Sequence, residues 1–265
     1  MEQKQSLQGR VILVGAGPGD PELITVRGLT ELRKCDMVVY DHLVSTELLK
    51  EIPPHAEAVY VGKKAGKHIK SQEEINAFLL ENARQGKTVV RLKGGDPFIF
   101  GRGGEECLYL REHGIPYEVV PGVSAMSAVP TYAGIPLTHR DVSSSFVVVT
   151  GHENPEKGDL QIDWKTVAEM GGTLVIFMGV LNLPSIAAQL IRYGRSPETP
   201  VAVIRWGTIA EQLTIEGTLG TIVQQIQEQN LRPPGLVVIG EVVALRGKLQ
   251  WFETVLKQKE NPKLV

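Results

Sequence analysis

The chain has 265 residues, of which 42% are hydrophobic and 22% charged, and its formal net charge is -2. This composition is typical of a globular protein with one large or two ordinary domains, and it lacks the basic excess of a nucleic-acid-binding protein. No apolar run approaches the length of a membrane span and the polar start Met1–Gly9 lacks a signal peptide, so we expect a cytoplasmic protein with no nucleic-acid or membrane partner.

The first half of the chain alternates predicted strands and helices. Short apolar, β-branched runs predict strands at 10–15, 36–40, 59–61, 88–92 and 116–120. Helices are expected from about Thr25, from Ser71 to about Gln85, and near 104–112, and Ser71 followed by Glu74 forms a capping box. This alternation predicts an α/β fold with a parallel sheet and helices on both faces.

A second unit is expected after the segment 134–144, which is rich in glycine, proline, serine and charged residues. Its predicted strands lie at 145–150, 173–178, 201–206, 212–217 and 236–241, and its helices lie near 163–170, 183–193 and 219–229. We therefore divide the chain into a polar extension 1–9, an N-terminal α/β domain 10–141, a C-terminal α/β domain 142–247, and a charged tail 248–265 in which Trp251 and Phe252 are the large anchors.

A glycine-rich loop follows the predicted strand 88–92. Five glycines fall within the eleven residues 94–104, together with Asp96, two phenylalanines and Arg102. In parallel sheets ligands bind beyond the carboxyl ends of the strands, and the segments 15–21, 41–42, 62–67 and 121–125 are expected at the same edge. The mixture of an acid, a cation and aromatic rings favours a polar, partly aromatic small molecule.

The first glycine segment also resembles a dinucleotide-binding loop, but its spacing differs. Gly15 and Gly17 are followed by Gly19, and Asp20 occupies the position of the third glycine in Gly-x-Gly-x-x-Gly. Asp41, at the end of the second strand, can imitate the acid that binds a ribose. A dinucleotide enzyme therefore remains a competing interpretation, as does a non-catalytic ligand-binding protein.

Metal and disulfide sites are not expected. Cys35 and Cys107 lie far apart, outside any Cys-x-x-Cys, and the six histidines contain no helical i, i+4 pair. We interpret both cysteines as buried free thiols.

Several segments together are similar to the tetrapyrrole methylase family. The matching stretches are Val14–Pro21, Val38–Asp41, Val61–Gly66, Arg91–Glu106, Pro121–Ala125, Gly134–Asp141, Val149–His152 and Phe177–Gly179. They fall between about residue 10 and about residue 252. The block Arg91–Glu106 and the run Leu137–Asp141 resemble one subgroup of this family, which acts on uroporphyrinogen III.

The resemblance implies two α/β domains with mainly parallel and mixed sheets, a cofactor in the cleft between them, and a homodimer. It implies C-methylation of uroporphyrinogen III at C2 and C7 to precorrin-2, in sirohaem- or cobalamin-type synthesis. S-adenosylmethionine would be the methyl donor and S-adenosylhomocysteine the product, without a metal. The alternative is a sibling methylase acting on another tetrapyrrole or on RNA. From the length before residue 10 we also expect later oxidation and chelation steps to belong to other proteins.

The resemblance also assigns site residues by position. Asp41 and Lys63 match the proton acceptor and donor, and the tetrapyrrole-binding positions match Arg102, Glu105, His139 and Arg140. The S-adenosylmethionine contacts match Pro18, Gly94, Gly95, Asp96, Ile99, Ser124, Ala125, Met178 and Gly207.

The chemistry leaves alternatives for several of these residues. Methyl transfer to carbon needs alignment, stabilisation of a cationic ring and removal of a pyrrole proton, and a carboxylate such as Asp41 suits the last two tasks. Arg102 is favoured as a carboxylate clamp, with a role as base as the rival. The simpler readings are that Asp41 caps a helix from about Leu43, Lys63 is a solvated loop charge, Met178 fills a core, and Glu105 is a favourable charge at a helix N-terminus.

Overall fold

The computed structural model describes residues 9–62, 71–152 and 162–260. The chain divides into two compact units, Met1–Ser124 and Ala125–Val265, each with its own buried core.

The division between the units lies earlier than the sequence suggested. The expected boundary followed Asp141, whereas the observed one follows Ser124. The reason is helix α4 (Ala125–Tyr132), which the sequence analysis did not predict. Its Val129 is buried in a cluster of the second unit that includes Val238, so this segment packs with the strands that follow it.

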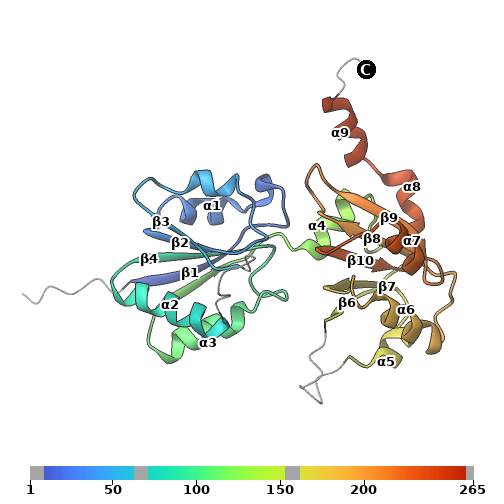
Figure 1. The fold of residues 1–265 in the computed structure, drawn as a ribbon, viewed down its shortest axis with the longest axis horizontal. Helices are drawn as coiled ribbons and strands as arrows, with labels where there is room; N and C mark the ends of the chain where they lie inside the picture. Colours follow the sequence, from blue (N-terminus) through green and yellow to red (C-terminus); the bar gives the residue numbers. More distant parts are fainter. Residues whose placement is uncertain (1–8, 63–70, 153–161, 261–265) are drawn as a thin grey trace, which may run out of the picture. The chain divides into compact units, whose positions relative to one another are not determined.

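The sheet of the first unit is parallel throughout its five strands, in the order β3-β2-β4-β1-β5 (Figure 1). The pairing register aligns Gly15 with Lys93 and Tyr40 with Leu92, so the carboxyl ends of three central strands meet at one edge. The strands are β1 Arg10–Gly15, β2 Met37–Tyr40, β3 Glu57–Tyr60, β4 Thr88–Lys93 and β5 Tyr117–Val120.

Helices cover both faces of this sheet, as the alternating pattern predicted. Helix α1 lies on one face, where Leu32 joins the cluster of Ile12 and Val14, and helices α2 and α3 lie on the other (Figure 1). The helical segments are α1 Val26–Leu32, α2 Gln72–Arg84, α3 Gly103–Glu112 and the 3₁₀ turns η1 Pro21–Leu23 and η2 Leu48–Glu51.

The predicted helix starts are confirmed by their hydrogen bonds. Thr25 Oγ1 accepts a bond of 3.0 Å from the Gly28 amide at the start of α1. At α2 the bonds are reciprocal: the Glu74 amide donates to Ser71 Oγ at 3.2 Å and the Ser71 amide donates to Glu74 Oε2 at 2.6 Å. These side chains satisfy amides that have no partner within the helix.

The second unit contains a mixed sheet of five strands, in the order β6-β7-β10-β8-β9. Strands β6 and β7 are parallel, and the remaining neighbours are antiparallel. The mixed arrangement agrees with the predicted fold class. The strands are β6 Phe146–Thr150, β7 Thr173–Phe177, β8 Pro200–Arg205, β9 Leu213–Thr218 and β10 Gly235–Ile239.

Helices also cover both faces of the second sheet. One core cluster joins α5, α6 and α7 to one face through Trp164, Leu183 and Ile222, and a second joins α4 and η4 to the other. The segments are α5 Trp164–Glu169, α6 Leu183–Arg192, α7 Ile222–Glu228, η4 Glu241–Leu245, α8 Arg246–Leu249 and α9 Phe252–Glu260.

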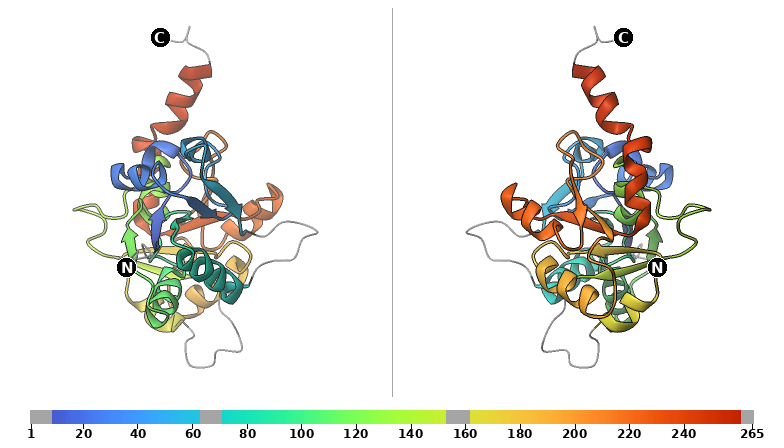
Figure 2. Two further views of the ribbon diagram at one scale, coloured as in Figure 1. Left: turned by 90° about the vertical axis from the view of Figure 1, so that its left-hand side faces the viewer. Right: turned by 90° about the vertical axis from the view of Figure 1, so that its right-hand side faces the viewer.

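The C-terminal segment is anchored by the two aromatic residues that the sequence singled out. The ring of Tyr132 in α4 lies 5.0 Å from that of Trp251 and 4.8 Å from that of Phe252. Beyond these rings α9 extends away from the second sheet (Figure 2). Within the described ranges, none of the helices combines the length and apolarity needed to cross a membrane.

Candidate active site

The carboxyl ends of the strands in the first unit converge, as the sequence predicted for the segments that the structure describes. The Gly95 amide donates to Gly17 O at 2.7 Å, and the Gly17 amide donates to Gly95 O at 3.3 Å. The loops after β1 and β4 are therefore joined by a pair of main-chain bonds. Gly95 has a φ of +67°, a left-handed conformation that favours glycine.

The loop after β4 also approaches the loops after β2 and β5. A Cβ atom at Gly94 would lie 2.6 Å from Leu43 Cβ, so only glycine fits at this position beside β2. Asp96 provides the second link, because its Oδ2 accepts a bond of 3.0 Å from the Gly122 amide and its Oδ1 accepts one of 2.8 Å from the Phe98 amide. Both oxygens of Asp96 thus hold main-chain groups of two loops in place.

The rest of this loop, up to α3, has a strained backbone. Phe100 and Arg102 have φ values of 51° and 58°, which residues with side chains rarely adopt. The side chains of Phe98 and Phe100 are exposed, while Ile99 is half-buried. Strain of this kind is concentrated at ligand sites, where the surrounding structure holds it.

Arg102 and Glu105 form a two-pronged ion pair at the exposed start of α3. Arg102 Nε donates to Glu105 Oε1 at 2.9 Å and Arg102 Nη2 donates to Glu105 Oε2 at 2.7 Å. The hydrogen bond that Arg102 donates to Glu105 raises the pKa of Arg102 above its usual value. This argues against Arg102 as a base, because a guanidinium must lose a proton before it can accept one, and Glu105 stabilises the protonated form.

Asp41 follows β2 and is half-buried. Its Oδ1 accepts a bond of 3.1 Å from the Leu43 amide, and its Oδ2 lies 3.5 Å from Arg91 Nη2. No helix begins at Leu43, where the chain forms a turn, so the helix-capping interpretation of Asp41 is wrong. Its carboxylate instead connects this turn with a buried arginine.

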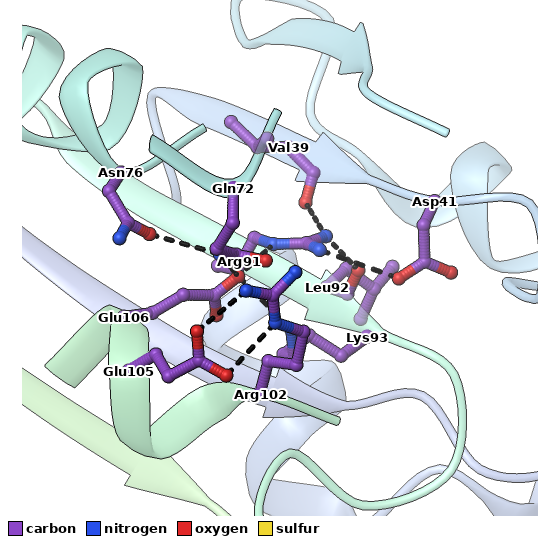
Figure 3. A network of polar contacts seen from close by, with 10 residues as sticks. All are labelled: Val39, Asp41, Gln72, Asn76, Arg91, Leu92, Lys93, Arg102, Glu105 and Glu106. Atoms are coloured by element: carbon purple, nitrogen blue, oxygen red, sulfur yellow. Dashed lines mark hydrogen bonds and ion pairs between the residues drawn. The ribbon is translucent and has the colours of Figure 1, made fainter. Parts of the chain in front are cut away.

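Behind Asp41 lies a buried charge network that the sequence analysis did not identify (Figure 3). Arg91 and Lys93 are each 4% exposed, and Glu106 is fully buried. Glu106 Oε1 accepts from Arg91 Nε at 3.1 Å, from Lys93 Nζ at 3.1 Å and from Gln72 Nε2 at 3.2 Å. Burial, and after it the Arg91 charge, lowers the pKa of Lys93.

A signal for this network was present in the sequence. Arg91 and Lys93 are two residues apart in a strand whose other residues after Thr88 are apolar. Because side chains alternate along a strand, both lie on the same face of the sheet. Two cations on a buried face require buried anions nearby. The predicted strand ended at residue 92, one residue before Lys93, so the two cations did not stand out as a pair on one face.

In the second unit, the predicted residues lie at strand ends with strained backbone. Met178 directly follows β7, has a φ of 53° and is 52% exposed, so it is not the core filler of the simpler reading. Gly207 follows β8 between Trp206 and Thr208, whose φ values are 49° and 73°. A Cβ at Gly207 would lie 2.5 Å from Val129 Cγ1 of α4, which explains the glycine.

The remaining predicted residues have simple local settings. Ser124 is buried just before α4, and Ala125 is the first residue of that helix. His139 is half-buried and its Nδ1 accepts a bond of 3.3 Å from the Asp141 amide, whereas Arg140 is exposed. Pro18 is half-buried in the loop after β1.

One predicted catalytic residue lies outside the described residues, namely Lys63. The neighbouring Lys64 and Lys67 lie in the same segment, 63–70. Within the described ranges, no group of three or more His, Cys, Asp and Glu residues is placed to hold a metal ion.

The chain matches one protein family over most of its length. A family model described as Tetrapyrrole (Corrin/Porphyrin) Methylases matches residues 10–223, which include β1 to β9 and every predicted site residue. The chain belongs to the tetrapyrrole methylases. The resemblance noted in the sequence is thereby confirmed.

Two relatives of this tetrapyrrole methylase differ in how much of their length it covers. The uroporphyrinogen-III C-methyltransferase of Methanocaldococcus jannaschii is 56% identical over 238 residues, which cover 89% of this chain and 98% of that protein. The siroheme synthase of Pseudomonas paraeruginosa is 51% identical over 245 residues, covering 92% of this chain and 52% of that protein. The chain thus spans about half the length of the second relative.

A solved structure of a tetrapyrrole methylase has the same fold. The crystal structure of uroporphyrin-III C-methyl transferase from Thermus thermophilus, complexed with S-adenyl homocysteine, matches with a TM-score of 0.76. It is 42% identical and covers 89% of this chain and 100% of that chain. The two-sheet α/β architecture expected from the sequence is therefore confirmed.

Proposed function

We propose that this tetrapyrrole methylase transfers methyl groups from S-adenosylmethionine to C2 and C7 of uroporphyrinogen III and so produces precorrin-2, a precursor of sirohaem and cobalamin. The observation that carries the proposal is the meeting of the loops after β1, β2, β4 and β5 around Gly94–Asp96, in a chain 56% identical to a uroporphyrinogen-III C-methyltransferase. Ligands of parallel sheets bind at this edge.

The described residues fit S-adenosylmethionine. Gly94 and Gly95 carry no side chains, and the turn that they form lies at the strand edge where ligands of parallel sheets bind. Asp96 fixes the shape of this turn, and Ser124 supplies a hydroxyl. We assign the remaining contacts to Pro18, Ile99, Ala125, Met178 and Gly207.

The chain's own residues would align the substrate, stabilise the cationic ring and remove a pyrrole proton. S-adenosylmethionine, when bound, supplies an electrophilic methyl group. Uroporphyrinogen III carries eight carboxylates, and the guanidinium groups of Arg102 and Arg140 are cations that suit them. We assign Glu105 to holding Arg102 in position, and His139 to the same substrate site.

Asp41 is the residue that we assign to the reacting ring. Its carboxylate would stabilise the positive charge that develops on the attacked pyrrole and accept the pyrrole proton. We assign Lys63 as the proton donor from its position in the sequence. The hydrogen bond between Arg102 and Glu105 favours a role for Arg102 as a carboxylate clamp over a role as a base.

The experiment that tests this function is an anaerobic assay with freshly reduced uroporphyrinogen III and methyl-labelled S-adenosylmethionine. We expect label in the macrocycle and a mass increase that corresponds to two methyl groups. If the protein binds S-adenosylhomocysteine but adds no methyl group, the substrate is wrong and a sibling tetrapyrrole or RNA should be tested. Retention of a nicotinamide nucleotide would contradict the methylase mechanism altogether.

The assembly and location of the protein are part of the same proposal. We propose a homodimer, on the basis of the resemblance, and light scattering of the purified protein measures it. The cytoplasm is the proposed location, from the composition of the chain and its two buried free thiols.

A further inference from the structure

Arg91, a member of the buried charge network, lies between Glu106 and Asp41, the proposed catalytic carboxylate (Figure 3). Its Nε donates to Glu106, its Nη1 donates to the carbonyls of Val39 at 3.2 Å and Leu92 at 3.1 Å, and its Nη2 faces Asp41. We propose that Arg91, Lys93 and Glu106 form a positioning network that holds the Asp41 carboxylate and the start of α3 in place for methyl transfer. This proposal rests on the proposed function.

The geometry makes Arg91 the fixed partner and Asp41 the positioned one. The guanidinium is bound by two strand carbonyls and a fully buried carboxylate, so its orientation does not depend on Asp41. The Asp41 side chain is 29% exposed, and its other oxygen is bound to the Leu43 amide. Both oxygens of the carboxylate therefore have a partner at the end of β2.

The network places more cations than carboxylates beside Asp41. Two cations, Arg91 and Lys93, face a single fully buried carboxylate, Glu106, and Asp41 is the second carboxylate within reach. Arg91 therefore faces a carboxylate on either side, Glu106 at Nε and Asp41 at Nη2.

Glu106 connects the same network to the substrate-binding pair. It lies in the first turn of α3, directly after Glu105 and one turn from Arg102. Lys93 is the last residue of β4 and directly precedes Gly94. One buried cluster thus ties together the segments that carry Asp41, the glycine turn and Arg102. Stability alone is a weak explanation, because apolar residues often replace buried ion pairs without loss.

The test is a double-mutant cycle between Arg91 and Asp41. Asp41→Asn should lower kcat by about 100-fold or more, as the loss of a general base does. Arg91→Lys keeps the positive charge but loses the planar guanidinium that donates to several partners at once. It should lower kcat by roughly tenfold. In the double variant we expect no loss beyond that of Asp41→Asn alone, because Arg91 acts through Asp41.

If Arg91→Lys does not fold, a second cycle that combines Glu106→Gln with Asp41→Asn tests the same network. Glu106→Gln keeps the shape of the side chain. The matched control is Arg195→Lys, since Arg195 is also buried, at 9% exposure, but among the described residues its hydrogen bonds go to backbone carbonyls. Its effect on kcat should be small and should add to that of Asp41→Asn. Calorimetric titration with S-adenosylhomocysteine should give Kd values within about twofold of wild type for Arg91→Lys.

The outcomes separate the network from the proposed function. If the wild-type chain is active and the kcat losses of both cycles are additive, the network is only structural and the proposal is overturned. A large loss of S-adenosylhomocysteine affinity in Arg91→Lys would also overturn it, because the effect would then reach the cofactor. An inactive wild-type chain contradicts the proposed function itself, and the network proposal falls with it.

Discussion

At the scale of single residues, Asp96 holds two loops through the two oxygens of one carboxylate. It accepts from the Phe98 amide at 2.8 Å and from the Gly122 amide at 3.0 Å. An asparagine side chain accepts at only one end, because its NH₂ group would face a main-chain donor. Asp96 therefore acts through the shape of the glycine turn.

We predict that Asp96→Asn lowers the affinity for S-adenosylhomocysteine by roughly tenfold, which corresponds to the loss of one buried hydrogen bond. Titration calorimetry of both proteins measures the change. Glu105→Gln is the control, because Glu105 is exposed on α3 and is assigned to the tetrapyrrole side. Wild-type affinity in Asp96→Asn would remove this turn from the cofactor site.

The two buried cysteines predict how the stability of the folded protein depends on pH. Burial raises the pKa of both Cys35 and Cys107 from 9.0 to about 11, with Glu106 adding to the effect at Cys107. In the unfolded chain the thiols ionise near their ordinary pKa, whereas in the folded chain they remain neutral for about two further pH units. Their contribution to stability is complete below pH 9 and is lost as the pH rises towards about 11.

The measurement is urea unfolding at several pH values between about 8 and about 10.5, across the window in which unfolded thiols ionise. The wild-type protein should lose more unfolding free energy over this range than a Cys35→Ala, Cys107→Ala double variant. That variant carries the same lysines and tyrosines, so it subtracts their titration. Parallel curves for the two proteins would contradict the assignment.

At the scale of elements, helix α2 depends on its capping box. Ser71 and Glu74 exchange hydrogen bonds at its start, and its first residue, Gln72, reaches Glu106. We predict that Ser71→Ala lowers the free energy of unfolding by about 1 kcal/mol, because a helix amide loses its acceptor. Urea unfolding measures this loss. Ser185→Ala is the control, since Ser185 is exposed inside α6, and an equal loss there would contradict the cap.

Most elements could be predicted because their signals are local. The apolar runs of β1, β4, β7, β8 and β10 and the caps of α1 and α2 depend on residues a few positions apart. Helix α4 was missed because Pro130 stands inside it and its burial depends on strands far along the chain. The same reason applies to the buried network, since Arg91 and Glu106 meet only in the fold. The loop residues of the site were found because glycine and acid spacing is visible in the sequence.

At the scale of the whole molecule, the two units have separate cores, and the tryptophans report on only one of them. Leu13 is buried in a cluster of the first unit and Leu174 in a cluster of the second. The three tryptophans, Trp164, Trp206 and Trp251, all belong to the second unit. Tryptophan fluorescence therefore follows the unfolding of the second unit, while far-ultraviolet circular dichroism follows both.

We predict that the two probes give different urea transitions when one core is weakened. Leu13→Ala creates a cavity that costs about 2–5 kcal/mol, and it should move part of the circular dichroism transition to lower urea while the fluorescence transition stays in place. Leu174→Ala is the matched variant and should move the fluorescence transition. If both probes shift together in both variants, the units unfold as one cooperative body, because a cavity in either core then destabilises the whole chain.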